Sequence, residues 1–419
     1  MRLTVITPHF HPDVAPTGEV VTRVVEELAG RNHEMHVVTA FPFYRTHRVE
    51  PPYEGRVVRH EDTPWGRITR VNPWPSDDKL NLVKRALAFS GFSALTALMG
   101  ARAGPTQGVL ALSPPLTLGV SGWLVARRNR CPFVFNVQDV YPDVAIDLGM
   151  LTQPRLIAAT RRLERFCYAR ADAVTVLSED LRDNVARKAG RPHAVKVIPN
   201  FVDTRRIVPA PSHNSYRSEF DLGDATVVMY AGNVGLSQSL ELVLDAAARL
   251  ANRTDVCFVV NGQGAARARL EHRARSLANV RFVDMQPADR LPEVLAAADV
   301  HLVPLKRGLT RSSVPSKIYS IFAATRPLVA SVDEDSEVAR IVQRSGAGIA
   351  VPPDDAEAFT AAVTELIDDV PRREAMGREG RSFVETTASP ATVALAYEKL
   401  FLELRLQLGE GAEAATLEL

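Results

Sequence analysis

Short runs of β-branched and other apolar residues recur along the chain and alternate with longer stretches of helical spacing. In the first half, the runs that predict strands lie at 2–7, 35–40, 57–60, 68–71, 108–112, 133–137, 173–177 and 195–198. Helical spacing separates most of them, as at 18–30, 116–127 and 155–170. Strands that alternate with helices indicate a mainly parallel sheet covered by helices on both faces.

The same alternation begins again after a turn-rich passage at 199–218, which contains Pro209 and Pro211 and reads as a linker. The second set of predicted strands lies at 227–230, 256–260, 280–283, 300–303, 328–330 and 348–351. After Pro353 the pattern is mostly helical. We therefore predict two α/β domains of the Rossmann-like type, at 1–198 and 219–388, and a final helical segment at 389–419 that packs back toward the first domain.

The composition indicates which partners and which cellular compartment to expect. The 50 basic and 49 acidic residues leave a net charge of +1, so nucleic acid is not an expected partner and any basic patch is local. Three cysteines far apart in sequence, Cys131, Cys167 and Cys257, are typical of reduced thiols. The amino terminus MRLTVITPHF lacks the pattern of a signal peptide, and we expect a cytoplasmic protein.

Two glycine-bearing turns follow predicted strands of the second domain. Gly232, Asn233 and Gly235 come after one strand and are expected to open a helix, and Gly262 and Gly264 come after the next strand. Ligands of open parallel sheets bind beyond the carboxyl ends of the strands, where glycine allows backbone amides to approach a phosphate. Each turn taken alone is equally typical of a tight structural turn.

A third turn carries charge. Ser316 and Lys317 follow Pro315 at the predicted start of a helix, after the strand at 300–303. A hydroxyl and an ammonium group at a helix start suit a leaving diphosphate. The alternative is a capped helix with a solvated lysine.

Several motifs in order resemble retaining GT-B glycosyltransferases of the GT4 type, especially the WbuB-like and colanic-acid-type branch that transfers aminosugars in surface-polysaccharide assembly. The motifs are GNVG at 232–235 with Gln238, VPSK at 314–317 with RPLV at 326–329, IPN at 198–200 with Asp203, and GAG at 346–348 with PD at 353–354. The loop and helix from Pro8, DVYPD at 139–143 and LSE at 177–179 also resemble this family. The resemblance therefore extends from the start of the chain to about Asp354.

The resemblance implies a GT-B fold with two parallel sheets facing a central cleft, an acceptor domain followed by a nucleotide-sugar domain, and C-terminal helices that cross back. It implies roles for Gly18 and Glu19 at the donor phosphate and sugar, and for Asp139 at the sugar or acceptor. It assigns the diphosphate to a set of residues in the second domain: Gly232, Asn233, Gly235, Gln238, Ser316 and Lys317. Met285 and Gln286 fall where the family contacts the base. Lys317, Asp139 and Glu19 are the implied catalytic residues.

The implied reaction is a transfer with retained configuration from a nucleoside diphosphate sugar, with UDP preferred over GDP, to a lipid-linked or glycan acceptor. No cofactor and no metal are expected. The sequence departs from the family at Ser312 and Ser320, which stand where two glutamates are common, so a hydroxyl such as that of Ser320 would serve the ribose. Thr325 and Gln138 replace a common glycine and a common histidine.

A peripheral contact with the inner membrane face is predicted through 79–102. Lys79, Lys84 and Arg85 precede an apolar run, and Arg102 follows it. Phe89, Phe92, Leu95 and Met99 share one helical face, and the run is too short to span a bilayer. A core helix packed on the first sheet has the same stripe and is the alternative.

Other classes of function predict sequence patterns that can be checked against this chain. His9, His11 and Asp13 alternate as metal ligands do, but no second ligand cluster completes a site. A nicotinamide-binding turn needs a third glycine, and Arg267 stands in that place. An epimerase or phosphorylase with the same fold stays open, because fold does not determine reaction. A noncatalytic sugar-nucleotide-binding subunit also stays open, because Ser312 and Ser320 replace the usual glutamates.

Overall fold

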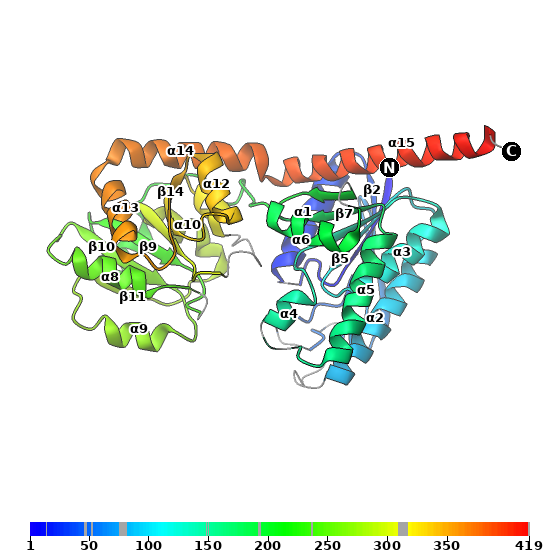
Figure 1. The fold of residues 1–419 in the computed structure, drawn as a ribbon, viewed down its shortest axis with the longest axis horizontal. Helices are drawn as coiled ribbons and strands as arrows, with labels where there is room; N and C mark the ends of the chain where they lie inside the picture. The colour runs from blue at the N-terminus through cyan, green and yellow to red at the C-terminus, as the bar shows by residue number, and fades with distance from the viewer. Residues whose placement is uncertain are drawn as a thin grey trace. The chain divides into compact units, whose positions relative to one another are not determined.

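The computed structural model describes residues 1–13, 15–45, 48–51, 53–74, 82–147, 149, 151–191, 194–235, 238–308 and 317–417, with the backbone alone at 82–87, 147 and 410–417. The chain divides into two compact units (Figure 1). Unit 1 comprises Met1–Asn200 with Val393–Leu419, and unit 2 comprises Phe201–Thr392. Each unit has its own sheet and its own apolar core, and the predicted fold class is confirmed.

The sheet of unit 1 has the strand order β3-β4-β2-β1-β5-β6-β7-β8 and is parallel except for the edge strand β3. Its strands are β1 Arg2–Thr7, β2 Glu34–Ala40, β3 Val58–Thr63, β4 Gly66–Val71, β5 Val109–Ser113, β6 Phe133–Val137, β7 Ala173–Val176 and β8 Val195–Val197. The eight strands predicted for this half are all present, with ends that differ by at most three residues.

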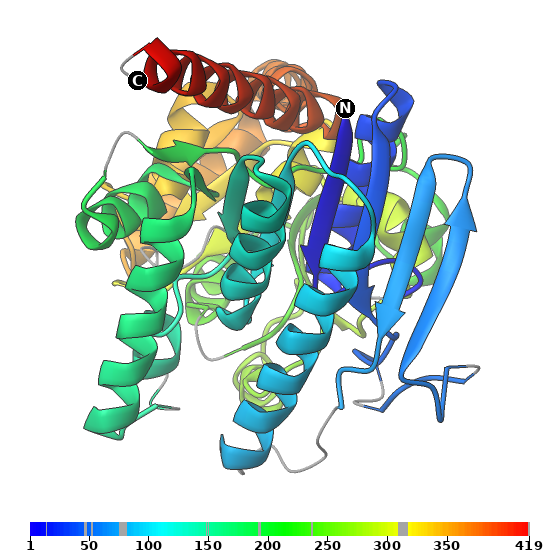
Figure 2. The ribbon, with the colours of Figure 1, turned by 90° about the vertical axis from the view of Figure 1, so that its right-hand side faces the viewer.

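The helices of unit 1 are α1 Pro16–Gly30, α2 Leu82–Arg102, α3 Thr117–Asn129, α4 Asp143–Asp147, α5 Pro154–Arg170, α6 Glu179–Ala189 and the greater part of α15 Pro390–Leu417. Figure 2 shows α2, α3 and α5 as a layer in front of the sheet. On the other face, α15 inserts Tyr397 and Phe401. A Cβ at Gly108 would lie only 2.7 Å from the Phe401 ring, so this glycine makes room for the helix.

The predicted membrane-facing stripe on α2 is wrong for most of its residues. Phe92 is 3% exposed, and Leu95 and Met99 pack against the core cluster of unit 1. Phe89, on the same face and one turn earlier, is 40% exposed. The stripe is therefore a core face that reaches solvent only toward the amino end of the helix. Among the described residues, no helix is both long and apolar enough to cross a membrane.

The sheet of unit 2 has the order β11-β10-β9-β12-β13-β14, and its strands are parallel. They are β9 Thr226–Ala231, β10 Val256–Asn261, β11 Val280–Val283, β12 Val300–Pro304, β13 Leu328–Ser331 and β14 Gly348–Val351, as predicted to within one residue. Alternate residues of β9 enter different cores: Val228 and Tyr230 join one cluster, and Val227 and Met229 join the other. Both faces of this sheet are therefore covered.

The helices of unit 2 are α7 Ser215–Glu219, α8 Glu241–Arg249, α9 Arg267–Arg273, α10 Leu291–Ala297, α11 Lys317–Ala323, α12 Glu337–Ser345, α13 Ala356–Asp368 and α14 Val370–Thr387, with a 3-10 turn at Ala288–Arg290. Helix α12 illustrates how the ends of these helices are capped. Ser336 caps its start by accepting a hydrogen bond from the Ala339 amide, and Gly346 ends it with φ at +62°.

The strand order reverses once in each sheet. In unit 1 the chain runs outward from β1 to β2 and later returns to place β5 on the other side of β1, and in unit 2 β9 and β12 are related in the same way. Connections leave the sheet on opposite faces at such a point, which opens a crevice beyond the carboxyl ends of the two strands. The two reversal points are where ligands are expected.

Candidate functional site

Lys317 lies at the reversal point of unit 2. It is the first residue of α11, in the connection that follows β12, and its Nζ lies 4.1 Å from the ring centroid of Tyr230 at the end of β9. A Cβ placed on Gly232 would lie 4.0 Å from the same nitrogen. The fold thus brings Lys317 to the glycine turn after β9. Ser316 and Ser312 lie outside the described residues.

The surroundings of Lys317 allow its protonation state to change when an anion binds. Burial lowers the pKa of the ammonium group to about 7. The face of the Tyr230 ring favours the cation, and the ring is itself held by a 2.6 Å hydrogen bond from its hydroxyl to the Asn233 carbonyl. An anion that binds here would raise the pKa and draw a proton onto the lysine.

Glycines in the two turns allow the backbone to pass at close range. Gly262 and Gly264 have φ of +157° and +158°, and a Cβ on Gly262 would lie 1.9 Å from the Gly232 carbonyl oxygen. A Cβ on Gly264 would lie 2.3 Å from the Val234 oxygen. The Val234 amide donates to the Gln263 carbonyl at 2.8 Å. These glycines are therefore required for the two turns to interlock, whatever ligand lies above them.

Two expectations about the first turn are wrong. The amides of Gly232 and Gly235, expected to face a phosphate, donate to the Asn261 carbonyl at 2.9 Å and to Gln238 Oε1 at 3.2 Å. Asn233 does not begin a helix, because α8 starts at Glu241. Gln238, which lies between Asn233 and α8, instead forms a β-bridge with Leu305, the residue after β12.

The remaining predicted residues of unit 2 are spread along the carboxyl edge. Gln263 donates to Asp284 Oδ1 at 2.7 Å, which links the turn after β10 to the one after β11. In that last turn Met285 is 49% exposed, and Gln286 Oε1 accepts a 2.8 Å hydrogen bond from Arg290. Ser320 lies one turn along α11 from Lys317 and is half-buried. The fold brings these residues to one edge of the sheet.

Two contributors were not identified from the sequence as parts of this site. Tyr230 was predicted only as the last residue of a strand, and its contact with Lys317 joins residues far apart in the chain. Ser239 donates a 2.6 Å hydrogen bond to Asp354 Oδ1, which ties the turn after β9 to the loop after β14. The Pro353-Asp354 motif was the available signal for this second pair.

In unit 1, Gly18, Glu19 and Asp139 lie at the carboxyl edge of the sheet. Gly18 and Glu19 are in the first turn of α1, where Glu19 is exposed, and Asp139 follows β6. Burial raises the pKa of Asp139. Among the described residues, no hydrogen bond or ion pair to this carboxylate is found.

Gln138 belongs to a buried hydrogen-bond network. Its Nε2 donates to Asn136 Oδ1 at 2.6 Å, and its Oε1 accepts from Asn200 Nδ2 at 3.0 Å. Asn136 in turn donates to the Tyr397 hydroxyl at 3.0 Å. Both ends of the Gln138 amide are thus occupied, and its role in unit 1 is structural.

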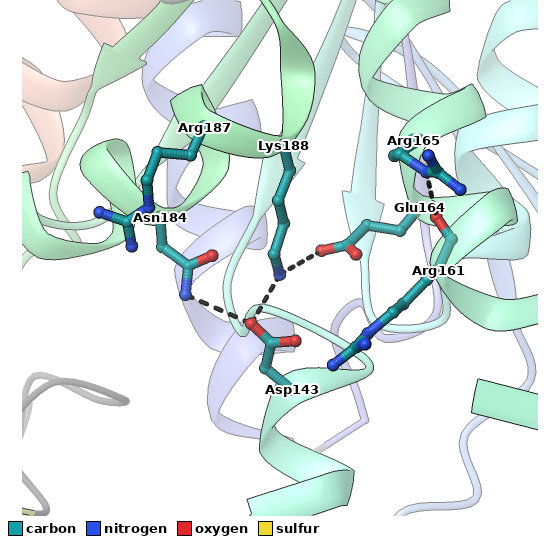
Figure 3. Close-up of a pocket in the computed structure, with 7 residues that line it drawn as sticks. All are labelled: Asp143, Arg161, Glu164, Arg165, Asn184, Arg187 and Lys188. Atoms are coloured by element: carbon teal, nitrogen blue, oxygen red, sulfur yellow. Dashed lines mark hydrogen bonds and ion pairs between the residues drawn. The ribbon is translucent and has the colours of Figure 1, made fainter. Parts of the chain in front are cut away.

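A polar depression of about 540 Å³ lies among α4, α5 and α6 of unit 1. At its centre Lys188 Nζ lies 2.6 Å from Asp143 Oδ2 and 2.8 Å from Glu164 Oε1 (Figure 3). Tyr168 donates a further hydrogen bond to buried Glu164 at 3.1 Å. The central charges are satisfied by one another, and the cluster joins the three helices.

The expected reduced thiols are observed, since Cys131, Cys167 and Cys257 are all free. His9 and Asp13 contact each other, with Nδ1 and Oδ2 2.6 Å apart. In the part of the chain that the structure describes, no group of three or more His, Cys, Asp or Glu residues is arranged to hold a metal.

Comparison with known families resolves the class of protein. The model described as "Glycosyl transferase 4-like domain" matches residues 17–200, and the one described as "Glycosyl transferases group 1" matches residues 225–369. The chain is a glycosyltransferase with the GT-B fold. The two matches fall one in each unit of the glycosyltransferase, and they support its membership of the GT4 type.

Two relatives match most of the length of the glycosyltransferase. It is 28% identical over 391 residues to the putative colanic acid biosynthesis glycosyl transferase WcaI of Escherichia coli K12, a match that covers 90% of this chain and 95% of WcaI. It is 28% identical over 303 residues to the probable glycosyltransferase WbjE of Pseudomonas aeruginosa, covering 71% and 74% of the two chains.

Solved structures share the fold at low identity. Sucrose-phosphate synthase from Thermosynechococcus elongatus superposes with a TM-score of 0.70 at 19% identity, over 96% of this chain and 99% of the other. HepE of Anabaena in complex with UDP superposes with a TM-score of 0.66 at 15% identity, over 96% and 100%.

Proposed function

We propose that this glycosyltransferase moves an N-acetylaminosugar from a UDP-sugar to a lipid-linked or glycan acceptor during surface-polysaccharide biosynthesis. The anomeric configuration is retained, and neither a metal nor a cofactor takes part. The observation that carries the proposal is Lys317 Nζ at the β9/β12 reversal point, above Tyr230 and beside Gly232. The match to WcaI, whose name refers to colanic acid biosynthesis, supports the branch, and the UDP complexes of HepE support the nucleotide.

In the proposed reaction, the bond between the anomeric carbon and the diphosphate oxygen breaks, and the electron pair leaves with UDP. Lys317 stabilises the charge that develops on the diphosphate. The acceptor oxygen forms the new bond on the same face of the sugar, and its proton passes to the leaving phosphate. Gly232, Asn233, Gly235, Gln238, Gly262, Gly264 and Ser316 surround the diphosphate in this proposal, Met285 and Gln286 contact the base, and Ser320 contacts the ribose.

Unit 1 holds the acceptor in this proposal. Gly18 and Glu19, at its carboxyl edge, contact the donor phosphate and sugar in the proposal, and Glu19 and Asp139 are catalytic. The Asp139 carboxylate, for which no hydrogen bond or ion pair is found among the described residues, is available to a hydroxyl of the sugar or acceptor. A carboxylate that is ionised accepts two or more hydrogen bonds from such hydroxyls.

Membrane contact is retained in the proposal but moves to one end of α2. Phe89 is 40% exposed and Trp74 is 44% exposed, and a Cβ on Gly91 would lie 3.6 Å from the Trp74 ring. Two exposed aromatic side chains near the start of an apolar helix suit the interface of a bilayer. Lys79 lies outside the described residues.

The proposal is tested in two stages. Calorimetry with UDP-, GDP- and ADP-sugars first identifies the donor, and a radiolabelled donor is then offered to lipid extracts and to defined glycans. Transfer of label with retained configuration, unaffected by chelators, is the expected result. Binding of a nucleotide sugar without turnover on any acceptor would instead favour the noncatalytic subunit, and conversion of the nucleotide sugar itself would favour an epimerase.

A further inference from the structure

The loop between β1 and α1 lies at the reversal point of the unit 1 sheet. It spans the residues between Thr7, the last of β1, and Pro16, the first of α1. Strand β1 has β2 on one side and β5 on the other, so this loop borders the crevice expected beyond the carboxyl ends of β1 and β5. His9 is in this loop, and neither the motifs nor the proposed reaction gives it a role.

Side chains from three elements fix the backbone of the loop. The Thr7 hydroxyl donates to the His9 carbonyl at 3.0 Å, and the Thr22 hydroxyl of α1 accepts from the His11 amide at 3.0 Å. Arg70 of β4 is buried and donates through Nη2 to the His11 carbonyl at 2.5 Å. Arg70 also pairs through Nε with Glu61 Oε2 of β3 at 2.9 Å, so the guanidinium connects the loop to the edge of the unit 1 sheet.

Contacts with neighbouring side chains also fix the orientation of the His9 imidazole. Its Nδ1 lies 2.6 Å from Oδ2 of Asp13, whose side chain is 2% exposed. Oδ1 of Asp13 accepts a 3.1 Å hydrogen bond from the Tyr44 amide. The imidazole stacks on Phe43 at 5.1 Å between centroids and meets Tyr44 edge-on at 5.4 Å. Asp13 and two aromatic rings therefore hold the ring in one orientation.

The contact with Asp13 determines whether the other ring nitrogen of His9, Nε2, is a hydrogen-bond donor or an acceptor. A carboxylate accepts hydrogen bonds, so Nδ1 of neutral His9 carries the hydrogen that points to Asp13. Nε2 then presents a lone pair, and among the described residues no donor to it is found. Such an atom accepts a hydrogen bond from a hydroxyl group and, while neutral, offers no donor to a phosphate.

A second unsatisfied polar atom lies near the same place. Ser113 ends β5, two residues beyond the pair Ile6 and Ala111, so the strand register puts it level with Pro8. Its buried hydroxyl has no hydrogen-bond partner among the described residues. The Ser113 hydroxyl is therefore a second hydrogen-bonding group at the carboxyl end of β5 that no partner in the described part of the chain occupies.

We propose that His9 Nε2 accepts a hydrogen bond from a hydroxyl of the acceptor sugar, and that Asp13 is the positioning residue that presents this lone pair. Tyr44, 44% exposed and beside the imidazole, gives the sugar ring an aromatic neighbour. The inference rests on the proposed function only in naming the acceptor as the sugar that is bound by unit 1. It assigns acceptor recognition to the loop between β1 and α1, whereas Gln138, which follows β6, is held in its own hydrogen-bond network.

Kinetics of the full chain test the inference. His9→Phe keeps the stacking but removes the lone pair, and we expect KM for the acceptor to rise roughly tenfold, as for one lost hydrogen bond, with kcat and the donor KM changed less than about twofold. Asp13→Asn should move the acceptor KM in the same direction. His11→Phe is the matched control, because His11 is in the same loop and exposed, and its acceptor KM should not change.

Nuclear magnetic resonance of histidine-labelled protein gives a readout that does not depend on turnover or on any variant's folding. The wild-type spectrum should show His9 protonated at Nδ1, and methyl glycosides of glucose, galactose and N-acetylglucosamine serve as probes. A shift of the His9 Nε2 resonance with any of these probes supports the inference. Protonation at Nε2 in the free protein would overturn it.

The two proposals fail in different ways. Wild-type transfer with an unchanged acceptor KM in folded His9→Phe overturns the assignment of His9 and leaves the proposed function standing. A fall in kcat of about a hundredfold or more at constant KM also overturns it, because that result is the signature of proton transfer and not of binding. Failure of wild-type protein to transfer any sugar overturns the proposed function itself.

Discussion

At the scale of single residues, the site depends on contacts that join distant parts of the chain. Lys317 was identified from its place after a strand and at a helix start, and the structure adds the Tyr230 ring and the burial that lowers its pKa. Neither could be predicted, because the sequence does not show that β9 and β12 are neighbours. The pairing of His9 with Asp13 was likewise visible only as a spacing that suggested metal ligands.

Replacing Lys317 by alanine should lower kcat by roughly two to three powers of ten, because one fixed cation no longer stabilises the leaving diphosphate. The measurement is steady-state transfer with the donor found by calorimetry. Lys196→Ala, at an exposed position on β8, is the control and should keep wild-type turnover. Near-normal turnover in folded Lys317→Ala protein would remove Lys317 from the mechanism.

Binding of UDP should depend on pH through Lys317. With a pKa of about 7, the free lysine is mostly neutral above that pH and must take up a proton to pair with the diphosphate. Affinity should therefore be highest below pH 7 and fall by up to about tenfold for each pH unit above it. Titration calorimetry in buffers of different ionisation enthalpy measures the proton uptake directly.

The control for this pH dependence is Lys317→Arg, whose guanidinium stays charged throughout the range. Its UDP affinity should vary little between about pH 7 and pH 9. If wild-type protein binds UDP without proton uptake at pH 8, Lys317 does not contact the diphosphate.

At the scale of secondary-structure elements, the sequence predicted the structure correctly wherever a hydrophobic pattern fits only one kind of element. All fourteen predicted runs became strands. Those inside the two sheets are mostly buried because both faces of each sheet are covered, whereas the edge strands β3, β8, β11 and β14 have exposed positions. Turns were less predictable. The chain after Gly232 was expected to enter a helix, but it first pairs with Leu305 at the end of β12, an interaction that no local pattern reports.

The apolar stripe of α2 shows another limit. Helical spacing put Phe89 and Phe92 on one face, and both a core and a membrane surface require such a face. The two residues differ in their surroundings: Phe92 packs in the core cluster of unit 1 at 3% exposure, whereas Phe89, one turn earlier, is 40% exposed.

The interlocked glycine turns provide a prediction at this scale. Gly264→Ala should lower the melting temperature markedly and weaken UDP binding at least tenfold, because its Cβ would meet the Val234 carbonyl oxygen at 2.3 Å. Gly223→Ala is the matched control, since Gly223 also has positive φ but no atom within 4 Å of the added Cβ. It should cost only the backbone strain, about 1 kcal/mol. Equal effects of the two substitutions would show that the close crossing of the turns is unimportant.

The position of α2 makes a second prediction. Phe92→Asp should destabilise unit 1 by several kcal/mol, because an ionised group would be buried without a partner. Phe89→Asp should change stability by less than about 0.5 kcal/mol but abolish sedimentation with anionic vesicles. Chemical denaturation and vesicle sedimentation on the same preparations separate the two effects. If wild-type protein does not sediment with anionic vesicles, the proposal of a membrane contact at this end of α2 is wrong.

At the scale of the whole molecule, the order of the chain does not coincide with the division into units. Residues 201–392 contain the sheet and the cores of unit 2, but the chain then returns to unit 1 through α15. The last segment is part of the first core. Phe401 is 1% exposed, and Tyr397 bonds through its hydroxyl to Asn136.

A chain that stops after Thr392 should therefore lose the fold of unit 1 and keep that of unit 2. The truncation removes Tyr397, Leu400 and Phe401 from the core of unit 1, and the loss of each large buried side chain costs about 3–5 kcal/mol, which together approach the whole stability of a domain. It also removes Glu398, whose Oε1 lies 2.8 Å from His33 Nε2. UDP affinity should survive, because Lys317 and the glycine turns belong to unit 2.

Calorimetric unfolding with and without UDP distinguishes the two units, since a ligand raises only the transition of the unit that binds it. The full chain should show a transition that UDP shifts and one that it does not, and the truncated chain should keep only the first. A chain that stops after Gly409 retains every buried side chain named above and is the control, with both transitions unchanged. If the truncation after Thr392 abolishes UDP binding as well, the nucleotide site does not belong to unit 2 alone, and the assignment of the diphosphate to Lys317 loses its structural basis.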